Sequence, residues 1–493
     1  MKEGIRRSTA FSLIAALACF PSLPVTAGAQ NSTPADPPLP LRDTLQKGYP
    51  ELFDLAPTLN FEPREIQKLR ETFKGSKDSC RNTFRSHAKL YQQQIDSARK
   101  NLKSGGDKLP DTQRHDLHCT IQNYDLLKSE ADVLSGQAIP TAYENLNSKL
   151  DLIEQWPEQY RLTMAEVSSG SYTTRRWGDV KDIGFRVIAS GQQDDVKRGQ
   201  QALEEMRRAG LLPPNLENKA IQSYVDSVAQ RIAQHSDLKV PLHVTLLDSR
   251  EINAFALPGG YLFIERGLLE AADDESELAG VIAHEIAHDT ARHSAKMMKR
   301  ATIASLFYSA AQVAAMILTG GVAGIGMYYA LQYGFYGLGM VIDLRLLGVS
   351  REYELEADQL GVQYAWNSGY DMTGFNRFFD KMATKEGYVN GVSWFRTHPP
   401  FYQRMVQAQR EMMFMPKQAE RIVQTSAFEA MKKELAPIAA AAEKEEVGKP
   451  SLLMTKEEGC KAPGKIEYKP GQPIEELCAR APRTLEAALP DAR

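Results

Sequence analysis

The sequence predicts an α+β protein that is predominantly helical, in which a helical N-terminal domain precedes a domain with a small, edge-stranded sheet. Amphipathic stretches with helical spacing recur along much of the 493-residue chain. Two short stretches, Leu242–Leu247 and Asn253–Glu265, instead have the β-rich alternation of strands. A Pro-Gly-Gly turn interrupts the second stretch, which therefore predicts a strand, a turn and a return strand.

The composition indicates a globular protein and excludes a nucleic-acid-binding surface. Hydrophobic residues make up 43% and charged residues 25% of the chain, and its length allows two or three domains. The formal net charge is −3 and the sequence contains no basic blocks. We therefore expect no nucleic-acid partner.

The first residues have the pattern of a signal peptide. Lys2, Arg6 and Arg7 form a basic region, an uncharged segment follows at Ala10–Phe20, and Ala27–Ala29 reads Ala-Gly-Ala. We predict cleavage after residue 29 and export to the cell envelope, most simply to a periplasm. The alternative is an uncleaved membrane anchor.

Four cysteines follow this segment, and an even number in an exported chain predicts disulfides. Three pairings are possible for Cys80, Cys119, Cys460 and Cys478. The local pairing, Cys80 with Cys119 and Cys460 with Cys478, closes the shortest loops. Each such bridge would contribute about 3–4 kcal/mol to the free energy of unfolding.

Residues 30–175 are predicted to form a helical accessory domain without chemistry of its own. A break at Ser104–Gly106 separates two of its helices and predicts an αα-hairpin, and the polar stretch Ser168–Trp177 marks the domain boundary. Residues 176–415 form the second predicted domain, and residues 416–493 a helical C-terminal extension with Cys460 and Cys478. The helices expected in these three parts are Glu62–Thr72, Ser79–Leu102, Asp111–Ser135, Thr141–Leu150, Asp194–Ala209, Leu216–Gln234 and Ser426–Glu443.

The segment from Ala301 to Ile342 carries no charged side chain. It is long enough to cross a bilayer twice. Its many glycines favour a hairpin that is buried in protein or touches a membrane surface over a double span. We predict that residues 301–342 form a mobile cover beside the cleft between the two segments that flank them and give the protein peripheral membrane contact, because an exposed apolar surface of this size needs covering.

The motif His284-Glu285-Ile286-Ala287-His288 has the spacing of a hydrolytic zinc site. Residues four apart lie on one face of a helix, so His284 and His288 present two imidazoles to one point, with Glu285 beside them. Asp274 and Glu277 form a capping-box pattern that begins this helix. Its apolar positions at helical spacing are Leu278, Val281, Ile282 and Ile286.

A second predicted helix, Ser350–Gly369, supplies the groups that such a site still needs. Glu354 and Asp358 share a face. Zinc needs a third protein ligand, and a ligating histidine needs an acceptor for its other ring N–H; Glu354 and Asp358 would fill these roles. The alternative is a solvated acidic face, because acidic residues alternate from Glu352 to Asp358.

Four motifs resemble the M48 family of zinc metallopeptidases, in particular its exported members related to outer-membrane quality-control proteases. The resemblance covers roughly Asp194 to Met412, and the motifs occur in the family's order. They are NAFALPGG at Asn253–Gly260, HEIAH at His284–His288, SREYELEAD at Ser350–Asp358 and THPP at Thr397–Pro400.

The resemblance implies a zincin-like metallopeptidase domain with one zinc per chain. His284, His288 and Glu354 are then the zinc ligands, Glu285 the general base and Asp358 the partner of a ligating histidine. His398 or Arg404 would stabilise the oxyanion; alternatively, His398 would occupy the open zinc position in a latent state, or belong to a purely structural turn.

The strand of the first motif would bind substrate. An extended peptide can add to the unpaired edge of a sheet, and the residues expected to line this edge are Asn253, Ala254, Phe255 and Ala256. The expected function is a zinc endopeptidase that cleaves misfolded or mis-assembled envelope proteins. The alternative is an envelope assembly factor or chaperone whose proteolysis is latent or minor.

Overall fold

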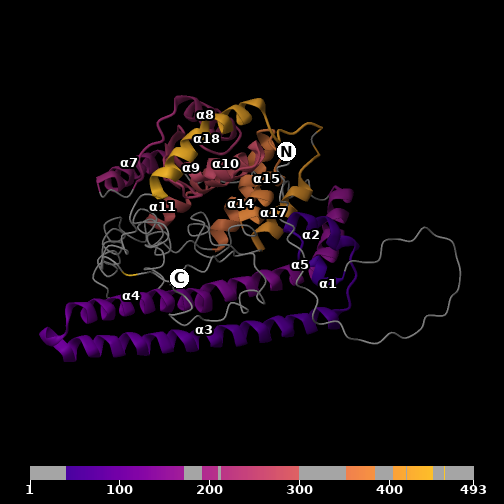
Figure 1. Cartoon of the computed structure of the whole chain (residues 1–493). Helices are drawn as coiled ribbons and strands as arrows, with labels where there is room; N and C mark the ends of the chain where they lie inside the picture. Colours follow the sequence, from indigo (N-terminus) through magenta and orange to yellow (C-terminus); the bar gives the residue numbers. More distant parts are fainter. Residues whose placement is uncertain are drawn as a thin grey trace, which may run out of the picture. The chain divides into compact units, whose positions relative to one another are not determined.

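A long helical hairpin forms the N-terminal part of the chain (Figure 1). In it, α3 (Pro63–Gly105) and α4 (Asp111–Val133) lie side by side, and the chain turns at Gly106, whose positive φ of 48° favours glycine. The break predicted at Ser104–Gly106 is therefore confirmed. The computed structural model describes residues 40–170, 191–208, 212–298, 351–382, 403–417, 419–447 and 460, which all belong to one compact unit beginning at Pro40.

Two of the predicted helices are one. The segments expected at residues 62–72 and 79–102 are both parts of α3, because its buried positions recur at helical spacing across the gap between them, from Phe73 to Cys80. The hairpin has its own apolar cluster, in which Cys80, Phe84 and Tyr91 of α3 pack against Leu127 of α4.

The shorter N-terminal elements pack on the helix that follows the hairpin. These elements are α1 (Leu41–Thr44), α2 (Tyr49–Leu55) and the 3-10 turn η1 (Ala56–Thr58), and the long helix is α5 (Ile139–Ser169). The buried Trp156 ring of α5 donates from Nε1 to the Phe53 carbonyl at 3.0 Å. Lys149 of α5 donates to the carbonyls of Leu45 and Lys47 at 3.2 and 2.6 Å. These bonds connect the residues that follow α1 to α5.

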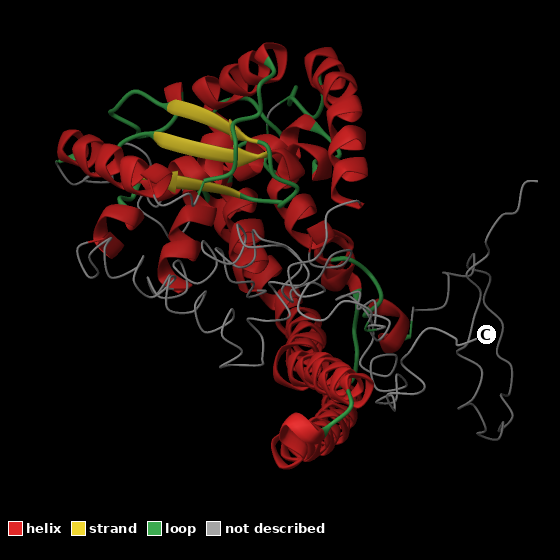
Figure 2. Cartoon of the chain, turned by 60° about the vertical axis from the view of Figure 1, so that its left-hand side comes forward, coloured by secondary structure: helices red, strands yellow, loops and turns green. Residues whose placement is uncertain are grey.

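The sheet has three strands in the order β1-β3-β2 (Figure 2). β1 (His243–Leu247) runs parallel to β3 (Tyr261–Glu265), and β2 (Ala254–Leu257) pairs with β3 in the antiparallel sense. Both predicted strand stretches are confirmed, with β2 at one edge. Gly259, with φ of 87°, makes the turn after β2, and its N–H donates to Asp289 Oδ1 at 3.0 Å, which ties this turn to the following long helix.

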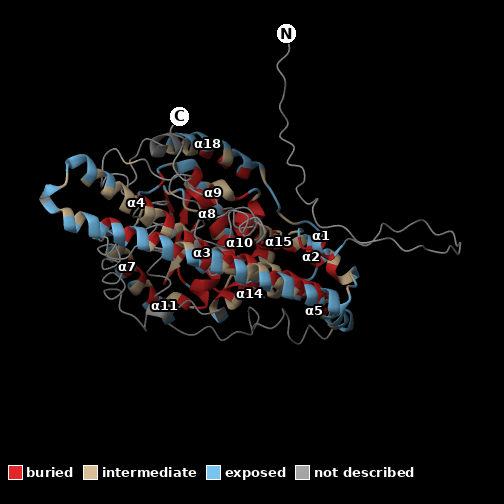
Figure 3. Ribbon diagram, turned by 60° about the horizontal axis from the view of Figure 1, so that its bottom comes forward, coloured by how far each residue is buried: buried red, intermediate tan, exposed pale blue. Residues whose placement is uncertain are grey.

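That long helix, α10 (Glu275–Thr290), is buried over its whole length (Figure 3). It packs against β2, against α8 (Lys219–Gln234) and against α14 (Arg351–Asn367) and α15 (Thr373–Lys381). Two glycines permit this close packing. A side chain at Gly361 would lie 3.0 Å from the backbone nitrogen of His284, and one at Gly280 would lie 2.9 Å from the backbone of Phe375.

The remaining helices complete one shared core. α18 (Ser426–Val447) packs on α8 and α9 (Arg266–Ala271), and Lys432 Nζ donates to the carbonyls of Leu269, Glu270 and Ala272 at the end of α9. One apolar cluster includes buried residues from all three predicted domains, so the domain limits stay a prediction. The other helices are α7 (Gln192–Arg208), α11 (His293–Met298) and α17 (Gln403–Phe414).

The predicted local disulfide pairing is wrong in this structure. Cys119 on α4 is bonded to Cys460, and Cys80 is also disulfide-bonded. Cys80 and Cys119 differ by about 17 residues in their distance from the turn of the hairpin, which is about 25 Å along a helix. Arg81, next to Cys80, instead donates to the Ser135 carbonyl beyond the end of α4.

Several predicted features lie outside the described residues. They are the signal segment 1–29, the part of the predicted domain boundary at residues 171–177, the uncharged segment 301–342, His398 with its THPP motif, and Cys478. Where the chain is described, none of its helices combines the length and the apolar character that crossing a bilayer requires.

Candidate metal centre

The N-terminus of α10 is capped as its sequence predicts. Asp274 Oδ1 accepts the Glu277 N–H at 3.0 Å, and the Glu277 carboxylate accepts the Asp273 N–H at 2.8 Å. The C-terminal extension adds a further bond here, because the Ser276 N–H donates to the Val423 carbonyl at 3.0 Å. These bonds fix the first turn of α10, and the four-residue spacing of His284 and His288 places both on the same side of the helix.

Three side chains converge at the middle of α10 and the first half of α14. The Nε2 atoms of His284 and His288 lie 3.0 Å apart, and the Glu354 carboxylate lies 3.7 Å from the first and 3.4 Å from the second. Zinc ligands at 2.0–2.2 Å in a tetrahedral site lie about 3.3 Å from one another. The donor set, its spacing and its burial therefore fit a single zinc ion, and the predicted ligands are brought together.

Asp358 and Arg404 lie behind the ligands. Asp358 Oδ1 is 2.9 Å from His284 Nδ1, so it accepts the ring N–H that a zinc-binding His284 must carry. Arg404 of α17 donates from Nε and Nη2 to the two Asp358 oxygens, both at 2.6 Å, and from Nη1 to Glu354 at 2.8 Å. These contacts give Arg404 the geometry of a positioning residue, and its oxyanion role stays a prediction.

Burial and the neighbouring charges have opposite effects on the pKa values of Asp358 and Arg404. Burial alone would raise the pKa of Asp358, but Arg404 and His284 together lower it below its ordinary value, so the carboxylate stays ionised. Burial alone would lower the pKa of Arg404, but Asp358 and Glu354 raise it. Both side chains are buried, and the guanidinium compensates the negative charge that the carboxylates bring to the site.

Glu285 follows His284 and is 1% exposed. Its charge contributes to the raised pKa of Arg404, which indicates that its carboxylate lies within electrostatic reach of the same buried group. A general base has to lie close to the metal ligands without being a ligand itself, and Glu285 meets this requirement.

Sequence reasoning missed two residues of the site, His293 and Glu356. His293 at the start of α11 is buried, its Nδ1 lies 3.0 Å from His288 Nδ1, and its Nε2 lies 3.0 Å from Glu356 Oε2 on α14. Burial lowers the pKa of His293 to about 4, against the opposing effect of Glu356. The sequence does contain a third histidine five residues after His288. On one continuous helix this spacing would not place His293 on the same face as His284 and His288, so it did not indicate a role at the site.

Of the four predicted substrate-binding residues, the two alanines direct their backbone groups away from β3, although Ala254 is itself buried. The side chain of Asn253 donates to Glu265 at 3.1 Å, and the ring of Phe255 is buried and stacked on Phe263. The Glu265 N–H bonds to the Asn253 carbonyl, so the backbone groups of Ala254 and Ala256 alternate to the outer side of β2. Ser294 Oγ of α11 donates to one of them, the Ala256 carbonyl, at 3.1 Å.

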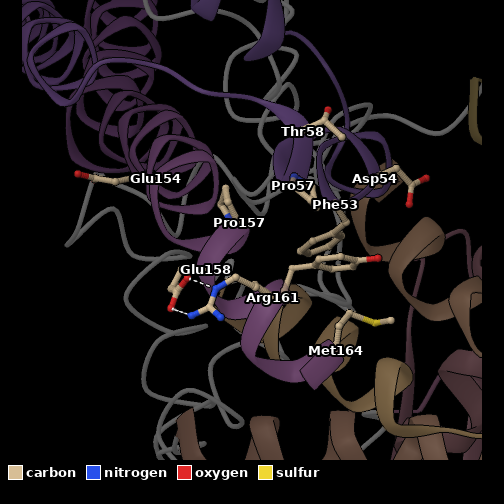
Figure 4. A pocket seen from close by; sticks show the side chains of 10 residues that line it. Phe53, Asp54, Pro57, Thr58, Glu154, Pro157, Glu158, Arg161 and Met164 are labelled. Atoms are coloured by element: carbon tan, nitrogen blue, oxygen red, sulfur yellow. Dashed lines mark hydrogen bonds and ion pairs between the residues drawn. The ribbon is translucent and has the colours of Figure 1, made fainter. Parts of the chain in front are cut away.

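Two other places carry no comparable chemistry. His115 Nε2 lies 3.5 Å from Cys119 Sγ, but the bond to Cys460 removes the thiolates that would bind a metal. An open cavity of about 830 Å³ lies between α2, η1 and α5, and its charged residues include the exposed pair Glu158 and Arg161 (Figure 4). None of the metal-cluster residues lines this cavity.

Comparison with known proteins adds to this geometry. Residues 215–412 match the model of peptidase family M48. The chain is 29% identical to the beta-barrel assembly-enhancing protease of Yersinia pestis over 227 residues, which are 44% of each chain. It is 28% identical to the protein of that name from Escherichia coli K12 over 207 residues, 41% of this chain and 40% of the relative.

A third relative carries another name. The mitochondrial metalloendopeptidase OMA1 of Schizosaccharomyces pombe is 33% identical over 188 residues, 37% of this chain and 50% of the relative. The aligned residues thus span half or less of the length of these three relatives. The residues that match the family model, 215–412, include the metal cluster of His284, His288 and Glu354.

Proposed function

We propose that the protein is a zinc-dependent endopeptidase of misfolded or mis-assembled envelope proteins, because residues 215–412 match the model of peptidase family M48, as the motifs predict. The similar proteins are proteases and metalloendopeptidases by name, which supports a metalloprotease. The observation that carries the proposal is the buried cluster of His284, His288 and Glu354, with Glu285 beside it.

Each residue of the site has a role in this proposal. Zinc held by His284, His288 and Glu354 would supply a Lewis acid that polarises the scissile carbonyl and lowers the pKa of water towards about 7. Glu285 accepts a proton from the attacking water at its carboxylate and returns it to the leaving amine. Asp358 holds the ring of His284 by accepting its Nδ1–H.

The open edge of β2 would hold the substrate. An extended peptide that pairs with Ala254 and Ala256 through main-chain hydrogen bonds is recognised without a particular side chain. This mode suits unfolded segments of many sequences, so we expect broad specificity. The Ser294 hydroxyl bonds to the Ala256 carbonyl, and a substrate strand has to displace this contact.

We propose the cell envelope, most simply the periplasm, as the place of action. The signal-peptide pattern of residues 1–29 and the disulfide between Cys119 and Cys460 both suit an oxidising compartment. The names of two relatives refer to beta-barrel assembly, so proteins of that assembly pathway are the proposed substrates. Peripheral membrane contact through residues 301–342 is part of this proposal.

The alternative function is an assembly factor or chaperone in which hydrolysis is latent or minor. The same edge strand that presents a substrate for cleavage can also bind an unfolded client without cleaving it. The buried Glu285 beside the metal ligands favours the peptidase, because binding alone does not use a general base.

Two variants of the full chain test the proposal. Glu285→Gln is expected to keep one zinc per chain and to lose cleavage of an unfolded protein, whereas Glu354→Gln is expected to lose most of the zinc. Glu352→Gln, on the exposed face of the same helix, is the matched control and should change neither property.

The readouts are metal content after dialysis and cleavage of a reduced, unfolded test protein. Wild-type zinc content in Glu354→Gln would overturn the ligand assignment. Undiminished cleavage by Glu285→Gln would overturn its role as general base. Absence of cleavage in the wild type, together with suppression of aggregation of the test protein, would favour the chaperone function.

A further inference from the structure

Among the described residues, His293 contacts the metal cluster through one of its members, His288. Its ring is buried, and its two nitrogens are directed to different partners, Nδ1 to His288 Nδ1 and Nε2 to Glu356 Oε2, both at 3.0 Å. The ring of Tyr353 stacks on it with the centroids 4.4 Å apart and the planes inclined by 15°. The position of the imidazole is therefore fixed from three sides.

The backbone that delivers His293 is unusual. α10 ends at Thr290, and Arg292 adopts the left-handed conformation with φ of 58°, which is uncommon for a residue with a side chain. Arg292 is held there by ion pairs of 2.5 and 2.9 Å to the buried Asp195 on α7. This reversal of the chain brings the residue that follows it back against the ring of His288.

The contacts determine where the protons lie when metal is bound. His288 directs Nε2 at Glu354 and at His284, so zinc binds that nitrogen and the ring proton is on Nδ1. His288 Nδ1–H then donates to His293 Nδ1, which must be unprotonated. The remaining proton of His293 is on Nε2, and it donates to the carboxylate of Glu356.

The two histidine ligands are thus supported differently. His284 donates directly to Asp358, a fully buried carboxylate that is also bound by Arg404. His288 reaches a carboxylate only through a neutral imidazole, and the side chain of Glu356 is 31% exposed. The chain of hydrogen bonds from His288 to a carboxylate therefore has two bonds instead of one, and it depends on the imidazole of His293.

We propose that His293 and Glu356 form a relay that positions His288 and fixes its tautomer for zinc binding. The inference rests on the proposed zinc site and adds two positioning residues to it. Neither residue is a ligand or a catalytic residue. Groups behind a metal ligand orient it and raise its basicity, and their loss typically weakens metal binding 10–100-fold.

Paired substitutions in the full chain separate this role from simple packing. His293→Asn keeps an acceptor near the position of Nδ1 but leaves a smaller side chain, whereas His293→Leu has nearly the size of histidine and no acceptor. The relay predicts that zinc binding weakens about 10–100-fold in His293→Leu and less in His293→Asn. A packing role predicts the reverse order, because leucine fills the space better.

Glu356→Gln tests whether the relay continues to the carboxylate. The amide still accepts a hydrogen bond but lacks the charge, so we expect weaker zinc binding in the wild-type background and no further weakening in the His293→Leu background. The readout is the zinc dissociation constant from competition with a chromophoric chelator, with thermal unfolding as a check of folding. His235→Leu, an exposed histidine of the same domain, is the control.

Three results would contradict the proposed relay. Equal zinc affinity in His293→Leu and the wild type, weaker binding in His293→Asn than in His293→Leu, or an undiminished Glu356→Gln effect without His293 would each overturn the relay. If His293→Leu does not fold, His293→Asn and Glu356→Gln still decide, since the relay requires both to weaken zinc binding in a folded chain. A wild type that binds no zinc would refute the proposed function itself, and the relay with it.

Discussion

Replacing Arg404 by methionine should destabilise the metal-free protein strongly. The guanidinium is fully buried and makes three contacts of 2.6–2.8 Å with Asp358 and Glu354, whose side chains are also buried. The substitution leaves both carboxylates in the core without this cation. Removing one partner of a buried pair costs about 3–5 kcal/mol, because the remaining charge keeps its desolvation penalty. We expect the free energy of unfolding to fall by that amount.

The assay is urea unfolding of the full chain, followed by circular dichroism, with and without zinc. Zinc should recover part of the loss, because the proposed ion is held by Glu354 and would compensate its charge. The matched control is Arg161→Met. Arg161 also forms two hydrogen bonds with a carboxylate, that of Glu158, but both side chains are exposed, so we expect no measurable change. Equal effects of the two substitutions would refute the argument that burial decides the magnitude.

Three further predictions concern other parts of the chain. Non-reducing peptide mapping should recover a peptide pair linked through Cys119 and Cys460, and two free thiols at these positions would contradict the structure. Ser294→Ala should lower the KM for peptide cleavage by freeing the outward carbonyl of the edge strand, and a raised KM would indicate that the hydroxyl assists substrate binding. Burial alone would raise the pKa of Asp371, but hydrogen bonds and Arg377 lower it, so its stabilising effect is present above about pH 4 and is lost as the pH falls further. Asp371→Asn should therefore be less stable than the wild type at pH 7 and lose less stability on acidification, as measured by unfolding at pH 7 and pH 3.

The sequence was sufficient for those parts of the site that local rules determine. Helical spacing alone placed His284 and His288 on one face, and the capping pattern at Asp274 predicted where their helix begins. Glu354 and Asp358 were predicted in the same way, from a four-residue spacing on a second helix. The alternative of a solvated acidic face is wrong for these two residues, because both are buried against the histidines.

The relay could not be found by such rules, since it depends on a chain reversal. Arg292 has no sequence feature that predicts a left-handed conformation, and its partner Asp195 lies on a distant helix. The role of Glu356 was also not predictable from spacing. It lies two residues from both Glu354 and Asp358, which places it about half a turn away from them on α14.

The disulfide prediction failed for a related reason. Loop-closure entropy favours the shortest loops in an unfolded chain, but two long antiparallel helices fix which residues are adjacent. Cys80 shares an apolar cluster with Leu134, just beyond the end of α4, and its neighbour Arg81 donates to the Ser135 carbonyl, so Cys119 is out of its reach. The length of α3 was the missing information, because the sequence suggested two shorter helices there.

The shared core has a consequence for the modularity of the peptidase. α17, which carries Arg404, packs on α5, and the Tyr49 N–H donates to Asp380 on α15 at 3.0 Å. Leu52 is buried in the same core as the catalytic helix, and burying one such side chain contributes about 1.5–3 kcal/mol. Residues 215–412 are therefore not expected to fold as an independent unit when they are separated from the N-terminal helices. We expect that a fragment has to include α2 and α5 if it is to retain the metal centre.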